Sequence, residues 1–162
     1  MSSSEDRPFD AVKDQIAPCG IWCGSCVAGN GALSELARKF RKTTEAYALE
    51  QWAPKDFDYA EFAKGLASIG SMPPCPGCLK GGGRDDCKIR VCAQEKQLHD
   101  CSACPTPNEC QHVDELRTMR SGAADAGLFV RDQSTDTDRL LKHWIADLKR
   151  RWPSSVLFID DA

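Results

Sequence analysis

The chain has 162 residues, of which 41% are hydrophobic, 28% charged and 7% aromatic. This length fits one domain or two, and the composition excludes a disordered chain, a collagen and a coiled coil. The formal net charge of −3 excludes a chain-wide basic surface for nucleic acid. Ten cysteines remain as the unusual feature, because packing alone uses far fewer.

Residues 1–8 are rich in serine and charge and end at a proline, which predicts a disordered N-terminus. They contain no apolar signal-peptide core, and no apolar run reaches the ~20 residues that a membrane span needs. We therefore expect a cytoplasmic protein without a membrane partner. In a reducing cytoplasm, cysteine clusters bind metals or carry redox chemistry. The alternative is five structural disulfides in an exported protein.

The first cysteine motif reads Cys19-x3-Cys23-x2-Cys26, and glycines inside it indicate a loop. The same spacing occurs in the cluster motif of radical S-adenosylmethionine enzymes. Those enzymes have larger folds with alternating strands and helices, and this sequence shows no such alternation. We therefore discount that interpretation of the motif.

Two amphipathic helices are predicted next, over residues 32–52 and 58–70. In the first, one face carries Leu33, Leu36, Ala37, Phe40, Thr44 and Tyr47. In the second, Asp58 and Glu61 have the spacing of a capping box, and Gly70 is expected to stop the helix. The expected buried stripe of the second helix consists of Tyr59, Phe62, Ala63, Leu66 and Ile69.

Seven of the ten cysteines lie in residues 75–110, which contain few apolar residues. Their spacings are Cys75-x2-Cys78, Cys87-x4-Cys92 and Cys101-x2-Cys104-x5-Cys110. Two thiolates separated by two residues can bind one ion through a tight turn, with each sulfur at about 2.3 Å. Because this knuckle region cannot form a conventional core, we expect metal bonds to fold it.

The spacing leaves the grouping of the thiols open. The gap between Cys78 and Cys101 is slightly long for a zinc ribbon, and a site built from the first four cysteines of the knuckle region fits equally well. Two four-thiolate sites leave two cysteines over, which are either buried and inert or part of an incomplete third site. His99 and His112 lie two residues from Cys101 and Cys110, and either could complete a three-cysteine site.

A weaker helix is predicted over residues 108–119, and a linker over residues 121–127. The final helix is expected over residues 136–152, with Pro153 ending it. Its apolar face carries Leu140, Leu141, Trp144, Ile145, Leu148 and Trp152. The apolar tail at residues 156–159 is expected to pack back on the helices, or alternatively to dock a partner.

These elements predict a mainly α fold: a small single domain of helices with an irregular, cysteine-rich metal-binding region. After the disordered N-terminus, the metal-binding domain covers residues 9–120, with the knuckle region at 75–110. Residues 121–162 supply the linker, the C-terminal helix and the tail, which pack on the same domain.

The motifs together resemble domain-of-unknown-function family 3795. The resemblance rests on Pro-Cys-Gly-Ile-Trp-Cys-Gly-Ser-Cys at residues 18–26, Cys-Pro-Gly-Cys-Leu at 75–79 and Cys-Lys-Ile-Arg-Val-Cys-Ala at 87–93. The later cysteines from Cys101 to Cys110 extend it, so that it covers roughly residues 17–120. It implies a prokaryotic, cysteine-rich, metal-binding protein without an established activity.

The predicted metal ligands are Cys19, Cys23, Cys26, Cys75, Cys78, Cys87, Cys92, Cys101, Cys104 and Cys110. We expect two structural zinc ions in an interaction module for an unidentified protein partner. An iron–sulfur cluster for electron transfer or sensing is the alternative, because thiolates bind both. A thiol metallochaperone or a zinc-dependent enzyme is a third hypothesis, although the absence of a recognisable catalytic motif argues against an enzyme.

Overall fold

The computed structural model describes residues 15–151. Within this range the chain forms six α-helices and four short 3-10 turns, with no β-strand. Two isolated bridges join Ile16 to Trp22 and Ile21 to Val130. The predicted mainly α fold is confirmed, whereas the predictions for residues 1–8 and 156–159 lie outside the described residues.

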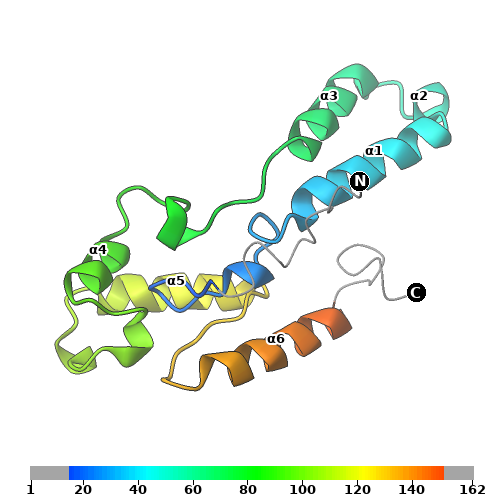
Figure 1. Ribbon diagram of the computed structural model, residues 1–162. Helices are drawn as coiled ribbons and strands as arrows, with labels where there is room; N and C mark the ends of the chain where they lie inside the picture. The colour runs from blue at the N-terminus through cyan, green and yellow to red at the C-terminus, as the bar shows by residue number, and fades with distance from the viewer. Residues whose placement is uncertain (1–14, 152–162) are drawn as a thin grey trace, which may run out of the picture.

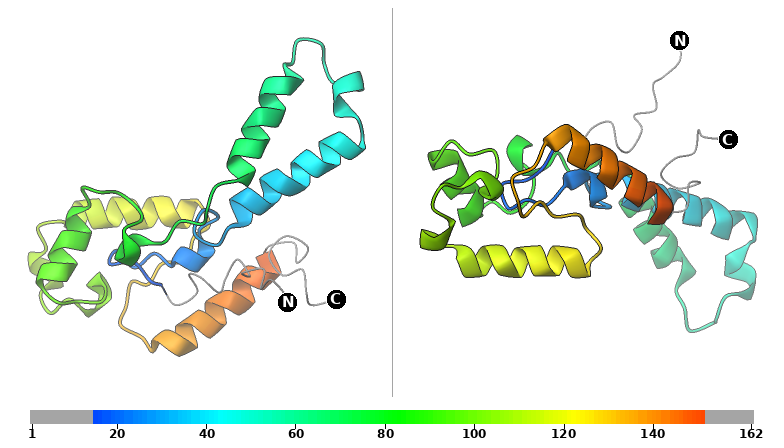
Figure 2. Two further views of the ribbon diagram at one scale, coloured as in Figure 1. Left: turned by 45° about the horizontal axis from the view of Figure 1, so that its top comes forward. Right: turned by 90° about the horizontal axis from the view of Figure 1, so that it is seen from below.

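Helices α1 (Ala32–Ala46), α2 (Leu49–Trp52) and α3 (Tyr59–Gly70) form an arm that projects from the other helices, as Figures 1 and 2 show. In the arm, α1 and α3 lie side by side. The Phe40 and Phe62 rings meet edge to face at 5.8 Å. Arg38 Nη1 donates to the Gly70 carbonyl oxygen at 2.8 Å, which ties the middle of α1 to the end of α3.

Three details of the arm differ from the sequence prediction. The single helix over residues 32–52 is wrong, because Ala48 adopts a left-handed φ of 48° between α1 and α2. Gly70 is the last residue of α3 rather than a left-handed stop. It is a glycine because a Cβ there would lie 3.0 Å from Cγ of Arg38. The predicted Asp58 cap is confirmed, since its side chain accepts a hydrogen bond from the Glu61 amide.

The apolar face predicted for α1 is largely exposed. Phe40 and Tyr47 are 52% and 72% exposed, whereas Ala37 and Thr44 are buried. The arm is only two helices thick, so each helix has a single neighbour and an apolar face wider than that neighbour stays in contact with solvent. The stripe on α3 is half-buried, except at Ile69, which is exposed.

Helix α6 (Thr137–Arg151) builds one core with Ile16, Trp22 and Ala32. Trp22 is fully buried, and its ring stacks on that of Trp144 with centroids 5.8 Å apart. Leu141 and Leu148 are buried on the same face of α6 as Trp144. The predicted C-terminal helix and its apolar face are therefore confirmed within the described residues.

A second core joins the segment from Ala17 to Ile21 with α4 (Lys88–Glu95) and α5 (Val113–Asp125). The sequence did not predict α4, whose Ile89 is buried against Cys19 and Cys87. The predicted helix over residues 108–119 is misplaced: residues 107–109 form a separate 3-10 turn, and α5 starts at Val113. Because α5 continues to Asp125 and buries Ala123, most of the predicted linker at 121–127 is helical. No helix in the described part of the chain is both long and apolar enough to cross a membrane.

Candidate functional site

The ten cysteines are all free thiols. By the thiolates that raise one another's pKa they fall into two sets, and Cys101 of the second set also packs against the core that contains Cys19 and Cys87. The six-thiol group consists of Cys19, Cys23, Cys26, Cys75, Cys78 and Cys87. The four-thiol group consists of Cys92, Cys101, Cys104 and Cys110. Helix α4 connects the two, because Cys87 is its N-cap and Cys92 lies in its body. This grouping differs from both pairings that the spacing left open.

The first part of the six-thiol group is a turn that aligns two thiols. Cys23 begins a 3-10 turn (Cys23–Ser25), and the Cys26 amide donates to the Cys23 carbonyl oxygen at 3.1 Å. Side chains three residues apart eclipse one another in a 3-10 helix, so this turn points both thiols the same way. Gly24 is required inside it, because a Cβ there would lie 2.3 Å from the Trp22 ring.

Gln15 joins this turn to the knuckle that contains Cys75 and Cys78. Its Nε2 donates to the Pro76 carbonyl oxygen at 3.0 Å, and the Cys23 thiol lies 3.7 Å from its Oε1 as a donor. The Cys75 amide donates to the carbonyl oxygen of Ala28 at 2.8 Å. Segments about fifty residues apart in sequence are thereby fixed side by side. Sequence reasoning missed Gln15, since nothing in the cysteine spacing identifies it.

The remaining members, Cys19 and Cys87, are buried in the second core, and Cys78 packs against them. Burial raises the pKa of the Cys19 thiol, as do the neighbouring thiolates of Cys78 and Cys87. Burial likewise raises the pKa of Cys23 to about 11, with further contributions from Cys78, Cys75 and Cys26. Cys78 thus has Cys19, Cys23, Cys75 and Cys87 as neighbours.

The four-thiol group repeats the same local turn. Cys101 begins a 3-10 turn (Cys101–Ala103), and the Cys104 amide donates to the Cys101 carbonyl oxygen at 3.3 Å. Asp100 caps this turn by accepting from the Ser102 amide at 2.8 Å. Cys110 follows a second 3-10 turn (Pro107–Glu109) as its C-cap.

Three cysteines of this group line a small cavity of about 10 Å³, together with Ile89, His112 and Leu116; the cysteines are Cys92, Cys101 and Cys110. Burial raises the pKa of Cys101 to about 11, and the thiolates of Cys110, Cys92 and Cys104 add to this effect. In such a cluster the protonated form of each thiol is favoured over the thiolate until a cation offsets the negative charges of the thiolates. The cavity has room for about one atom of solvent size.

The two candidate histidines lie in different environments. His112 lines the cavity beside Cys110 and Cys101. His99 is exposed, and its Nδ1 lies 3.2 Å from Asp100 Oδ2 rather than beside the thiols of the cavity. Of the two histidines, only His112 therefore shares an enclosed space with the thiols.

An arginine accompanies each group. Arg90 Nη1 donates to the Gly82 carbonyl oxygen at 2.9 Å, and the positive charge of Arg90 acts to lower the pKa of Cys78 against the stronger effect of burial. Arg120 Nε donates to the Cys19 carbonyl oxygen at 2.8 Å, and its charge acts in the same way on Cys101. The Nη2 atom of Arg120 is buried and has no hydrogen-bond partner among the described residues. Arg120 lies beyond the cysteine motifs in α5, and the cysteine spacing does not identify it.

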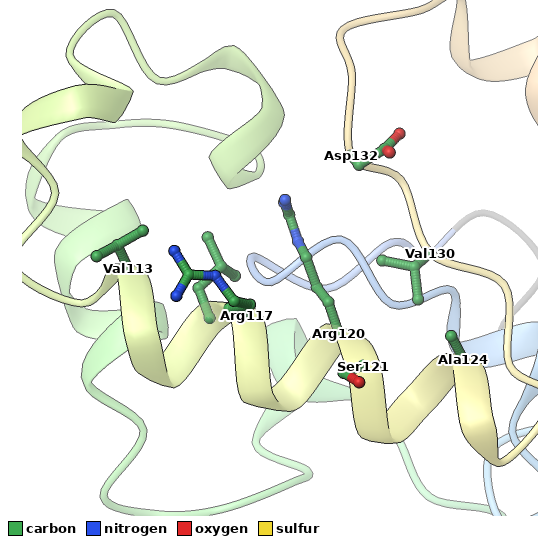
Figure 3. A pocket seen from close by; sticks show the side chains of 8 residues that line it. Val113, Arg117, Arg120, Ser121, Ala124, Val130 and Asp132 are labelled. Atoms are coloured by element: carbon green, nitrogen blue, oxygen red, sulfur yellow. The ribbon is translucent and has the colours of Figure 1, made fainter.

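Figure 3 shows the side chain of Arg120 extending away from α5 toward the neighbouring loop. Beside it, an open cavity of about 490 Å³ is lined by residues of α5, together with Val130 and Asp132. Arg117 also lines this cavity, but its Nη1 is engaged with Asp114 Oδ1 at 3.0 Å.

The donor chemistry of both groups fits a soft or borderline divalent metal, because thiolates are the ligands that zinc and iron–sulfur clusters prefer. Within residues 15–151, however, no three Cys, His, Asp or Glu side chains converge closely enough to form a finished coordination shell. The structure thus shows which thiols are neighbours. The backbone amides of Ile21 and Cys78 act to lower the pKa of the Cys19 and Cys23 thiols, against the stronger effect of burial.

The family model described as "Protein of unknown function (DUF3795)" matches residues 15–115. The match covers more than half of the chain, and the chain therefore belongs to this family, as the cysteine motifs suggested. No curated protein and no solved structure matches it. The matched range contains both thiol groups and ends at the start of α5.

Proposed function

We propose that this member of the DUF3795 family binds zinc through its cysteine thiolates, and that the metal stabilises the fold of the cysteine-rich part. The observation that carries the proposal is the gathering of all ten thiols into two groups. Each group contains a Cys-x2-Cys turn of the same 3-10 geometry. A structural zinc site contributes about 10 kcal/mol or more to folding, which offsets the scarcity of apolar residues in this region.

A structural role for the metal accords with the surroundings of the thiols. The members are buried or half-buried, and an arginine lies beside each group. Free thiols suit a reducing cytoplasm, which is where we place the protein. We propose that the folded protein acts as an interaction module for a protein partner, and the exposed aromatic side chains on the projecting arm support this role.

The test is the metal content of untagged protein purified without oxygen. Zinc, iron and acid-labile sulfide are measured per chain. The proposal predicts stoichiometric zinc, little iron and a colourless solution. Brown protein with iron and sulfide would overturn zinc in favour of an iron–sulfur cluster, and protein without bound metal would overturn both.

A pair of variants links the metal to the thiols. Replacing Cys101 and Cys104 by serine should lower the zinc content and the melting temperature. The matched control is Ser102→Ala, because Ser102 lies between these cysteines and its buried hydroxyl has no hydrogen-bond partner within residues 15–151. The control should keep its zinc, and equal metal loss in both variants would argue against thiolate ligation.

A further inference from the structure

The projecting arm has an apolar side that is exposed to solvent. Leu33, Leu36 and Phe40 follow one another at helical spacing along α1, and all three are exposed. Phe40 meets Phe62 of α3, and Ile69, seven residues farther along α3, is exposed as well. We call these five residues the apolar arm face. Monomeric proteins rarely expose an apolar surface of this kind unless a partner or another part of the chain covers it.

The chain leaves α6 at the base of this arm. Leu148, in the last turn of α6, is buried in the same core as Ala32, the first residue of α1. Figures 1 and 2 show the end of α6 near the base of the arm. Residues 152–162 follow α6, outside the described part of the chain. Their sequence includes Val-Leu-Phe-Ile at 156–159, and two aspartates come directly after it.

This C-terminal segment is long enough to reach the apolar arm face. Residues 156–159 come five to eight positions after Arg151. An extended chain of that length spans roughly 16–29 Å. Phe40 is eight residues beyond the first residue of α1, which is only about 12 Å along the helix axis. Tyr47 and Trp52 lie farther out along the arm, so a segment seated near the base leaves them exposed for a protein partner.

The charges of the segment complement those beside the apolar arm face. Lys39 and Lys42 continue the row that Leu33 and Leu36 begin, since each lies three residues after the one before it. Lys42 is exposed and has no ion-pair partner within residues 15–151. Over residues 35–45, four cations against two carboxylates give α1 a local charge of +2. The two aspartates that follow the apolar run carry −2.

We propose that residues 156–159 dock on the apolar arm face of the same chain, with Asp160 and Asp161 beside Lys39 and Lys42. Burial removes apolar surface of both the segment and the arm from water, which is favourable. Because the segment is tethered at the base of the arm, its effective concentration there is on the order of millimolar. Docking involves only the arm and the segment, so it is independent of the zinc function and can fail while that function stands.

The experiment compares amide hydrogen exchange in the 162-residue chain and in two variants of the segment. Replacing Leu157 and Phe158 together by serine removes apolar side chains, and replacing Ser154 and Ser155 together by alanine is the matched control. The first variant should exchange about tenfold faster in residues 33–40 and 62–70, because burial of one leucine or phenylalanine shifts an equilibrium by at least this factor. The control should exchange like the wild type. Unchanged exchange in the first variant, or equally fast exchange in the control, would overturn the docking.

A further variant tests the arm and the segment against each other. Leu36→Ser should speed exchange as the segment variant does, and combining the two should have little additional effect. Additive effects would overturn contact between Leu36 and the segment. Light scattering should give the mass of a single chain for the wild type. A dimer that dissociates when Leu157 and Phe158 are replaced would overturn docking within one chain in favour of exchange between two copies.

Discussion

Asp100 is a buried carboxylate that joins three segments of the chain. Its side chain accepts from the Ser102 amide, lies 3.2 Å from Arg131 Nη1 and contacts His99. Burial acts to raise the pKa of this carboxyl, but the hydrogen bonds from Ser102 and His99 and the charge of Arg131 lower it below the usual 3.8. The four-thiol turn is in this way fastened to the segment that leads into α6.

Replacing Asp100 by asparagine should destabilise the protein by about 3 kcal/mol, because a buried arginine loses its counter-charge. A carboxyl with a lowered pKa contributes stability above its unfolded pKa and loses it as pH falls through the folded value. The stability difference between wild type and variant, measured by urea unfolding, should therefore shrink as pH falls below about 4. A difference that stays constant with pH would contradict the ion pair.

The position of Gly77 has no room for the side chain of any other residue. Its φ is 84°, and a Cβ would lie 1.6 Å from Gln15 Oε1, the atom that links the Cys75 knuckle to Cys23. Gly77→Ala should therefore lower both the melting temperature and the metal content. The matched control is Gly65→Ala in α3, where a Cβ meets nothing within 4 Å. Removing that helical glycine should stabilise by up to about 1 kcal/mol. Equal effects of the two changes on metal content would contradict the role of Gly77.

At the scale of secondary-structure elements, the features that depend on residues close together in the sequence were predictable. The cap at Asp58 and the apolar face of α6 depend on residues a few positions apart, and both are as predicted. Helix α4 escaped prediction because only Ile89 and Ala93 mark its buried face, among polar residues and cysteines. The break at Ala48 escaped because nothing in the sequence requires a left-handed residue there.

The ring contacts among Trp22, Phe129 and Trp144 hold α6 against the segment that contains Trp22. Trp144→Ala should cost about 3–5 kcal/mol, since it leaves a cavity beside the fully buried Trp22. The control is Trp52→Ala on the arm, where the side chain is 65% exposed. Urea unfolding of both variants checks the prediction. A comparable loss in the control would show that the arm is more tightly covered than its exposure indicates.

At the scale of the whole molecule, the candidate site depends on contacts that spacing does not encode. The cysteines themselves and their Cys-x2-Cys turns were visible in the sequence. Their division into groups depends on long-range hydrogen bonds, such as those from the Cys75 amide to Ala28 and from the Cys101 amide to Pro18. These bonds place the knuckle region around the first motif. As a result, Cys87 and Cys92 belong to different groups, although only four residues lie between them.

The arm and the cysteine-rich part of the molecule differ in the interactions that stabilise them. The arm relies on packing between α1 and α3, including the rings of Phe40 and Phe62. The thiol groups join the first motif to α4 and to the loops that precede α5. Removal of metal should therefore loosen the second part and spare the first.

Amide hydrogen exchange with and without a strong chelator tests this most directly. We predict that the chelator removes zinc and speeds exchange in residues 16–29 and 75–112, while exchange in α1 and α3 changes little. Unchanged exchange around the cysteines, in protein shown to have lost its metal, would contradict the claim that metal–thiolate bonds stabilise this part of the fold.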